Sequence, residues 1–138
     1  MERILGLDVG DKTIGVAVSD LLQYTAQGLM TIKRESKVKD LKAIETLLIE
    51  YDAKKVVVGL PKNMNGSIGP QCEKVIKFAE KIKNKFKIEI IYIDERLTTV
   101  SAERILIESD VRRENRKKVI DKIAASYILQ SYLDRKGE

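Results

Sequence analysis

Three carboxylates stand at positions in the chain where they could do chemistry. Asp8 lies near the end of a short apolar run, residues 3–9, and Glu95 follows a second apolar run, residues 88–93. Ligands of open α/β sheets bind beyond the carboxyl ends of parallel strands, so Asp8 and Glu95 are expected to approach each other if the two runs form parallel strands. Asp121 lies on a predicted amphipathic helix and is the third candidate.

Each of these acids also has an ordinary structural explanation. Asp8 is followed by Gly10 and could begin a turn, and Glu95 could be a solvated surface residue. Asp121 shares a helix face with two alanines, where an unpaired carboxylate would be costly, but it could also pair with neighbouring lysines. Taken one at a time, the three positions leave these alternatives open.

Three acids that converge from two strands and a helix would form a metal site made only of oxygen ligands. Mg²⁺ and Mn²⁺ prefer carboxylates and commonly bridge to phosphate. Two such ions about 3.5–4 Å apart can activate water on one side of a phosphodiester and stabilise the leaving oxygen on the other. The predicted cofactor is therefore Mg²⁺ or Mn²⁺, held by Asp8, Glu95 and Asp121.

The composition excludes several other kinds of chemistry. The chain has no histidine, which excludes Ser-His-Asp and Cys-His triads, histidine-ligated zinc and histidine general bases. Its one cysteine, Cys72, has no partner for an internal disulfide or a metal site. With 138 residues, 43% of them hydrophobic and 34% charged, we expect a single globular domain over residues 1–138. The absence of a signal peptide and of a membrane-length apolar run predicts a cytoplasmic protein without a membrane partner.

A net charge of +5 suggests an anionic partner, although a lysine-rich proteome would explain the charge equally well. The excess is uneven, because residues 70–138 carry 16 basic and 12 acidic side chains. The densest basic run precedes Asp121 and is expected to follow nucleic-acid phosphates rather than form only a solvated face. It consists of Arg112, Arg113, Arg116, Lys117 and Lys118. A second basic stripe, Lys74, Lys77 and Lys81, indicates exposed surface rather than a site.

The hydrophobic periodicity predicts elements in the order β-β-β-α-β-α-β-α-α. Strands are expected at residues 3–9, 13–19, 24–32, 55–60 and 88–93. Helices are expected from residue 38, with Ser36 as N-cap, from residue 71, from residue 98 or 99 to 107, and over 118–133, with a charged connector at 110–118. A hairpin followed by βαβ crossovers predicts an α/β fold with a five-stranded mixed sheet, its first three strands antiparallel, flanked by helices.

Further polar residues are candidates for binding nucleic acid. The glycine-rich loop 59–70 contains Asn63, Asn65 and Ser67, which could hydrogen-bond phosphates or bases or could simply belong to a strand–helix connection. Lys12 in the first turn could contact phosphate or remain solvated. Arg96 could clamp a phosphate or form a salt bridge with Asp94 or Glu103.

Four segments together resemble one known family. They are DVGDKTIGVA at 8–17, GLPKNMNGS at 59–67, DERLTTVSAE at 94–103, and DKIAA at 121–125 continuing to ILQSYL at 128–133. In this order and spacing they resemble the YqgF family, whose members are described as Holliday junction resolvases and as pre-16S rRNA nucleases. The resemblance spans residues 3–134, almost the whole chain.

The resemblance implies a ribonuclease H-like fold related to RuvC-type resolvases, a bacterial cytoplasmic location and a role in maturing the 5′ end of 16S rRNA. Asp8, Glu95 and Asp121 match the catalytic positions of the family. Two positions depart from its pattern: Thr13 stands where the family usually has arginine, and Asn65 stands where many members have aspartate. If that arginine contacts phosphate, this chain depends more on its other cations.

The leading hypothesis is a metal-dependent endonuclease that acts on structured RNA, within or beside ribosomal precursor particles. The close alternative is a resolvase of four-way DNA junctions, which requires two active sites and therefore a homodimer rather than a monomer. An alternative of another class is a non-catalytic nucleic-acid-binding ribosome-assembly factor. A sugar-kinase or Hsp70-type ATPase has a similar opening motif but needs a second comparable domain, for which 138 residues do not suffice.

Overall fold

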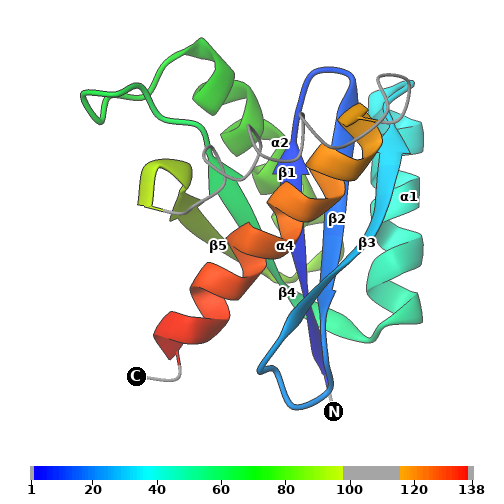
Figure 1. Cartoon of the computed structure of the whole chain (residues 1–138). Coiled ribbons are helices and arrows are strands. Elements are labelled where there is room, and N and C mark those ends of the chain that lie inside the picture. The colour runs from blue at the N-terminus through cyan, green and yellow to red at the C-terminus, as the bar shows by residue number, and fades with distance from the viewer. Residues whose placement is uncertain (1, 98–115, 137–138) are drawn as a thin grey trace.

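The computed structural model of the chain describes the backbone of residues 2–97 and 116–136 and the side chains of residues 2–96 and 122–136 (Figure 1). The elements are β1 (Arg3–Val9), β2 (Thr13–Ser19), β3 (Ala26–Lys33), α1 (Lys37–Glu50), β4 (Ala53–Leu60), α2 (Pro70–Phe86), β5 (Glu89–Asp94), the short 3-10 helix η1 (Glu95–Leu97) and α4 (Arg116–Lys136). The predicted helix ending at 107 and the predicted connector up to residue 115 lie outside the described residues.

The five strands form one mixed sheet in the order β3-β2-β1-β4-β5. β1 pairs antiparallel with β2, and β2 pairs antiparallel with β3, whereas β4 lies parallel to both β1 and β5. The first turn is tight, since the Gly10 N–H donates to the Thr13 carbonyl at 2.9 Å. The predicted five-stranded sheet with three antiparallel leading strands is confirmed.

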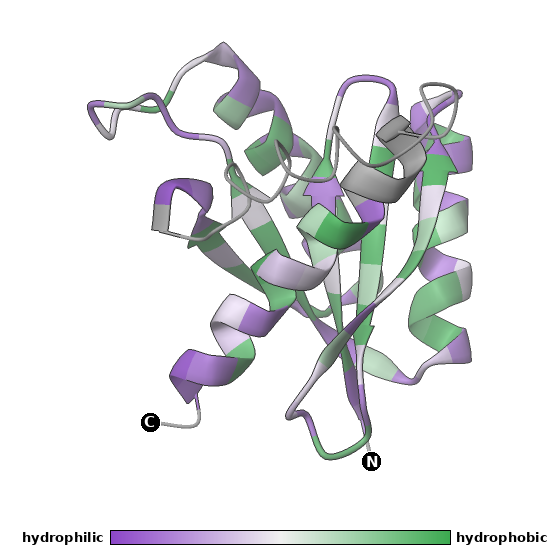
Figure 2. Cartoon of the chain, in the orientation of Figure 1, coloured by the Kyte–Doolittle hydropathy of each residue, from purple (hydrophilic) through white to green (hydrophobic). Residues whose placement is uncertain are grey.

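Two helices cover one face of the sheet and a third crosses the other (Figure 1). β1 contributes to both cores because its side chains alternate: Leu5, Leu7 and Val9 pack with α1 and α2, whereas Ile4 packs with α4. Apolar residues therefore concentrate on the central strands and on the inner sides of the helices (Figure 2). The carboxyl ends of β1, β4 and β5 remain at one edge between these layers.

The third strand begins two residues later than the sequence predicts, at Ala26. The carboxylate of Asp20 accepts hydrogen bonds from the backbone N–H groups of Tyr24, at 2.7 Å, and Thr25, at 3.0 Å. These bonds keep residues 20–25 in a turn, so Tyr24 cannot join the ladder. Hydrophobic periodicity does not detect such a side-chain-to-backbone turn.

The helix ends follow local signals in the sequence. The Ser36 side chain accepts from the Lys39 N–H at 3.2 Å and caps α1 as predicted, a contribution of about 1 kcal/mol. Pro70 occupies the first turn of α2, where its missing N–H costs nothing. α4 begins at Arg116, two residues before the predicted start. None of the helices in the described part of the chain is both long and apolar enough to cross a membrane.

Candidate active site

Strand direction brings Asp8 and Glu95 to the same edge of the sheet. β1 and β5 both run parallel to β4, so the three strands end together. Gly59 of β4 pairs with Ile93 of β5, and the residue before it pairs with Leu7 of β1. Asp8 therefore lies beside Gly59 on one side, and Glu95 follows β5 on the other.

The carboxylate of Glu95 lies directly over Gly59. A Cβ atom at position 59 would come within 3.0 Å of Glu95 Oε1 and within 2.5 Å of Ile128 Cδ1. Glu95 Oε1 is buried, and Ile128 belongs to α4. The space that glycine leaves in β4 is thus occupied by this carboxylate and by α4 together, which places Glu95 on the α4 face of the sheet.

Asp8 faces the same side of the sheet as Glu95. Side chains alternate along a strand, and Leu7 and Val9 point into the core beneath α1 and α2. Asp8 therefore faces the α4 side, as Ile4 does. Two acids separated by 86 residues of chain thus lie at one edge and on one face.

Asp121 lies in α4, one helical turn before Ala125, and its side chain is outside the described residues. The Ala125 carbonyl oxygen would lie 3.0 Å from a Cβ atom at Gly6, two residues before Asp8. α4 begins at the edge of the sheet where β1 ends (Figure 1). The backbone of α4 thus brings position 121 toward the end of β1 that contains Asp8.

α4 approaches the sheet closely because glycines lie beneath it. A Cβ atom at Gly6 would come within 2.7 Å of Leu129 Cβ, and one at Gly28 would come within 2.6 Å of Lys122 Cγ. The alanines of α4 were named from the sequence, but the glycines of the sheet were not recognised as points of contact with the helix, and Gly59 was named only as the first residue of the loop 59–70. The available signal was a glycine inside otherwise apolar strands, which often marks a close approach of another element.

Arg96 is bound to neighbouring protein groups. Its Nη2 lies 2.6 Å from Asp94 Oδ2, its Nε donates to both oxygens of Asp94 at 3.1 Å, and its Nη1 donates to the Met64 carbonyl at 3.1 Å. The Arg96 side chain, through its hydrogen bonds, holds the pKa of Asp94 below its usual range. Of the alternatives for Arg96, the structure shows the salt bridge to Asp94, which ties the loop after β4 to the end of β5.

The polar residues of loop 61–69 bind one another. Asn63 Nδ2 donates to Ser67 Oγ at 3.0 Å, and Ser67 Oγ donates to Asn65 Oδ1 at 2.6 Å. The Ser67 N–H donates to Asn65 Oδ1 at 3.0 Å. These bonds close a turn that projects from the sheet edge beside α2 (Figure 1). Asn63, Asn65 and Ser67 therefore shape the loop, and their predicted contact with nucleic acid stays a prediction.

The predicted basic residues lie at two places. Lys12 is exposed in the turn between β1 and β2, on the edge that contains Asp8. Arg116, Lys117 and Lys118 form the first turn of α4, and their side chains are outside the described residues, as are Arg112 and Arg113 altogether. Contact between this basic run and nucleic-acid phosphates therefore stays a prediction.

The described residues fit a hard divalent cation only in part. Asp8 and Glu95 offer carboxylate oxygens on one face, and Gly59 leaves room for the Glu95 carboxylate. No cluster of three metal-ligating side chains occurs among the side chains that the structure describes, which do not include Asp121. The donor chemistry suits Mg²⁺ or Mn²⁺, and a third ligand would have to come from α4.

Comparison with protein families gives one match over nearly the whole chain. Residues 2–135 match a family model described as "RuvX: Holliday junction resolvase". The chain belongs to the RuvX family. Membership in RuvX confirms the prediction that the chain is a nuclease. The matched residues 2–135 include all four segments that resemble the YqgF motifs.

Two relatives are similar to this chain over nearly their full lengths. A protein from Caldanaerobacter subterraneus is 65% identical over 133 residues, which cover 96% of each chain. One from Clostridioides difficile is 60% identical over 134 residues, covering 97% of this chain and 95% of the relative. Both relatives bear the name "Putative pre-16S rRNA nuclease".

A solved structure shows the fold that RuvX shares with more distant proteins. Thermus thermophilus RuvC in complex with a Holliday junction substrate superposes with a TM-score of 0.62 at 11% identity, covering 99% of this chain and 97% of RuvC. At this identity the likeness concerns the fold alone. Together with the mixed sheet, it confirms the predicted RNase H-like fold.

Proposed function

We propose that this chain is a metal-dependent endonuclease that hydrolyses phosphodiester bonds at the 5′ end of the 16S rRNA precursor. The proposal assigns the activity to one RNase H-like domain over residues 1–138, acting in the cytoplasm during ribosome biogenesis. Asp8, Glu95 and Asp121 are its catalytic and metal-binding residues, and Mg²⁺ or Mn²⁺ is its cofactor.

One observation supports this proposal above the others, namely the position of Asp8 and Glu95 on either side of Gly59. Both carboxylates lie on the α4 face at the carboxyl ends of parallel strands. Acidic side chains gathered at such an edge repel one another unless a cation is shared between them. If these acids served only in a surface salt bridge or a turn, one acid would be enough, and no glycine would be needed beneath its carboxylate.

The residues of this chain position the reacting groups. Asp8 is held by the paired strand β1, and Glu95 is held by the close packing of Ile128 against Gly59. A divalent cation bound to these carboxylates would supply Lewis-acid activation of water and neutralise charge on the scissile phosphate. Arg96 fixes the loop beside the site through Asp94 and Met64, which limits where a substrate strand can enter.

The choice of RNA rests on the relatives. Proteins that are 60–65% identical over nearly their whole lengths are named for pre-16S rRNA. The predicted contacts to such a substrate are Lys12, Arg96, the loop residues Asn63, Asn65 and Ser67, and the basic run Arg112, Arg113, Arg116, Lys117 and Lys118. A pre-ribosomal particle would present the precursor in its folded form.

The family description favours a second candidate, cleavage of four-way DNA junctions. A junction has two symmetric strands to cut, so this activity requires a homodimer with two sites. A protein that stays monomeric in the presence of a junction would contradict this candidate, whereas RNA cleavage needs only one site.

The decisive experiment compares cleavage of a 16S precursor fragment and of a synthetic four-way junction with Mn²⁺ present. Wild type should cut the RNA at a defined position, and Asp8→Asn should lose activity by more than about 100-fold, because even groups that only support a metal ligand are worth about 10–100-fold. Asp52→Asn is the matched control, since Asp52 is exposed in the turn before β4, and its positive φ of 48° suits asparagine.

The outcomes separate the candidates. Cleavage of the junction alone would replace the RNA proposal with the resolvase activity. A wild type that binds RNA but cuts neither substrate, or an Asp8→Asn protein that cuts as well as wild type, would overturn the nuclease proposal and favour a non-catalytic assembly factor.

A further inference from the structure

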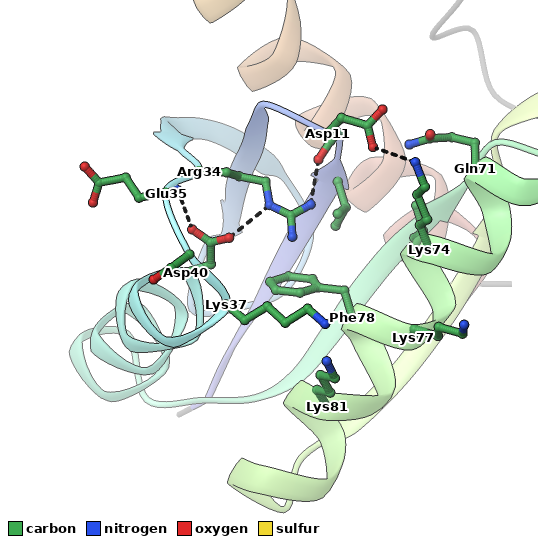
Figure 3. A pocket seen from close by; sticks show the side chains of 14 residues that line it. Asp11, Arg34, Glu35, Lys37, Asp40, Gln71, Lys74, Lys77, Phe78 and Lys81 are labelled. Atoms are coloured by element: carbon green, nitrogen blue, oxygen red, sulfur yellow. Dashed lines mark hydrogen bonds and ion pairs between the residues drawn. The ribbon is translucent and has the colours of Figure 1, made fainter.

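A pocket lies between α1 and α2, on the face of the sheet opposite to the candidate active site, and is called the α1–α2 groove below. Its volume is about 410 Å³, within the roughly 300–1,000 Å³ range of ligand sites. The buried side chains of Phe78 and Val75 line it, as do Gly10 and Asp11 of the β1–β2 turn, and Figure 3 shows Phe78 beneath Arg34. Asp8 lies two residues before Gly10, so this pocket and the candidate active site adjoin the same turn from opposite faces.

The acidic residues of this pocket are already neutralised by protein groups. Asp40, whose side chain is 4% exposed, pairs with Arg34 at 3.0 Å. Asp11 pairs with Lys74 at 3.6 Å. Glu35 pairs with a lysine outside the pocket, Lys39, at 3.5 Å. These pairs cancel the negative charge that would otherwise repel an anion.

Three further lysines of the pocket form no ion pair with the acidic residues that the structure describes: Lys37 of α1 and Lys77 and Lys81 of α2. Lys37 and Lys81 point toward one another across the pocket (Figure 3). Hydrogen bonding with Lys37 and the positive charge of that lysine lower the pKa of Lys81. The two lysines therefore place positive charge side by side at this part of the pocket.

The cations are arranged in a row rather than around a point. Lys74, which pairs with Asp11, continues the row of Lys77 and Lys81 along α2, and the three span eight residues, with about 10 Å of helix from the first to the last at 1.5 Å per residue. Inorganic phosphate would occupy only part of such a row. Successive phosphates of a polynucleotide would use more of it, and the row leads to the turn beside Asp8.

We propose that the α1–α2 groove, lined by Lys37, Lys77 and Lys81, binds backbone phosphates of the nucleic-acid substrate at a point away from the bond that is cut. The chemistry it recognises is the phosphate group, without selection of bases. This inference depends on the proposed function only for the identity of the polymer that binds. The existence of an anion site in the groove does not depend on it.

Arg34 connects this groove to the candidate active site. Its Nη1 donates to the Gly10 carbonyl at 2.7 Å, its Nε bonds Asp40, and its guanidinium lies 4.8 Å from the centre of the Phe78 ring. The β1–β2 turn is therefore held from the groove side. A strand bound along the lysines would pass over this turn toward the α4 face.

The test measures how binding of the 16S precursor fragment depends on salt, in the Asp8→Asn background so that the RNA is not cut. Replacing Lys37, Lys77 and Lys81 by glutamine should reduce the slope of log K against log salt by about two, since each lost phosphate contact is worth about 0.7–0.9. All three side chains are exposed, so the variant should fold normally, which thermal unfolding checks.

The matched control replaces three exposed lysines near the far end of α2, Lys83, Lys85 and Lys87, and removes the same charge. The proposal expects little change in slope for this control. Equal slopes for the two triple variants would overturn the proposal, because the effect would then come from net charge alone.

A second arm separates a nucleic-acid backbone from a free phosphate. Inorganic phosphate is titrated against both triple variants, with the thermal unfolding midpoint as readout. A groove that binds inorganic phosphate tightly while the RNA slope stays unchanged would also overturn the proposal. If wild type cuts no substrate but the groove variant still lowers the slope, the proposed function fails and the groove proposal stands.

Discussion

The two faces of the sheet gather opposite charges beside the same turn. On the α4 face, Asp8 lies beside Gly59 and the Glu95 carboxylate lies over it, and α4 packs closely against Gly59 through Ile128. On the α1–α2 face, exposed lysines line an open groove, and its acids are paired. Clustered like charges cost free energy, and a ligand of the opposite sign would relieve that cost on either face.

The difference between the faces also lies in rigidity. The carboxylates are positioned by strand register and by a contact that excludes even one methyl group. The lysines project from helices on flexible side chains and can follow a phosphate backbone without a fixed geometry. Chemistry on a bond requires the first arrangement, and holding a polymer requires only the second.

The largest effect should come from filling the space over Gly59. In Gly59→Ala the new methyl group would meet Glu95 Oε1 and Ile128 Cδ1, so cleavage should fall by about 100-fold through displacement of the carboxylate. Overpacking should also destabilise the protein by about 1–3 kcal/mol. Nuclease assays and urea unfolding measure the two losses.

Val58→Ala is the control from the other face of the same strand. Val58 is fully buried beneath α1 and α2, and its truncation should cost about 2 kcal/mol by leaving a cavity. Cleavage by the folded protein should nevertheless remain. Similar losses of activity in both variants would show that stability, not the position of Glu95, sets the rate.

An intermediate effect is expected from Arg34→Met. The change leaves the buried Asp40 carboxylate without its ion pair and should lower the free energy of unfolding by about 2 kcal/mol, less than for a fully buried pair because Arg34 is 22% exposed. Lys39→Met breaks the exposed pair with Glu35 and should cost less than about 0.5 kcal/mol. Equal losses in urea unfolding would contradict the difference between buried and exposed pairs.

The smallest effect concerns Tyr92, on the α1–α2 side of β5. Burial, with a hydrogen bond to Glu80 at 3.0 Å, raises the pKa of Tyr92 to about 12. Because the folded-state pKa lies above the ordinary value of 10, the folded protein keeps this proton longer than the unfolded chain. The stability it contributes is complete below about pH 10 and is lost as the pH rises through about 12.

Absorbance titration of tyrosinate measures this shift. Tyr92→Phe should remove the late ionisation and cost about 1 kcal/mol at neutral pH through the lost hydrogen bond. Glu80→Gln should lower the pKa of Tyr92 only in part, since burial is the larger cause. Tyr24, which is 70% exposed, serves as the internal reference. Ionisation of Tyr92 together with Tyr24 would refute the expected shift.

Sequence reasoning predicted most of the fold because local signals and tertiary structure agree. The five strands and the helices α1, α2 and α4 all follow hydrophobic periodicity, and Ser36 caps α1 as expected. The later start of β3 was missed because the Asp20 carboxylate binds backbone groups four and five residues away. Such turns depend on one side-chain oxygen, which no apolar period reveals.

The candidate site was predictable only as a set of residue types. Asp8 and Glu95 could be chosen because each follows an apolar run, and the parallel strands do bring them to one edge. Gly59 stands out in the sequence only as a glycine inside an apolar strand, and its importance for the site depends on the Glu95 side chain that lies over it. For Arg96 the sequence allowed either a phosphate contact or a salt bridge, and the structure shows the salt bridge to Asp94.

The sequence by itself determined the elements, the absence of histidine chemistry and the acids available for a metal. Only the tertiary structure decided which residues share a place. Strand register places Asp8 beside Gly59. The packing of α1 and α2 on one face of the sheet brings Lys37 near Lys81, although the residues of each pair are far apart in the chain. The physical reason is that period and propensity act over a few residues, whereas register and packing depend on the whole core.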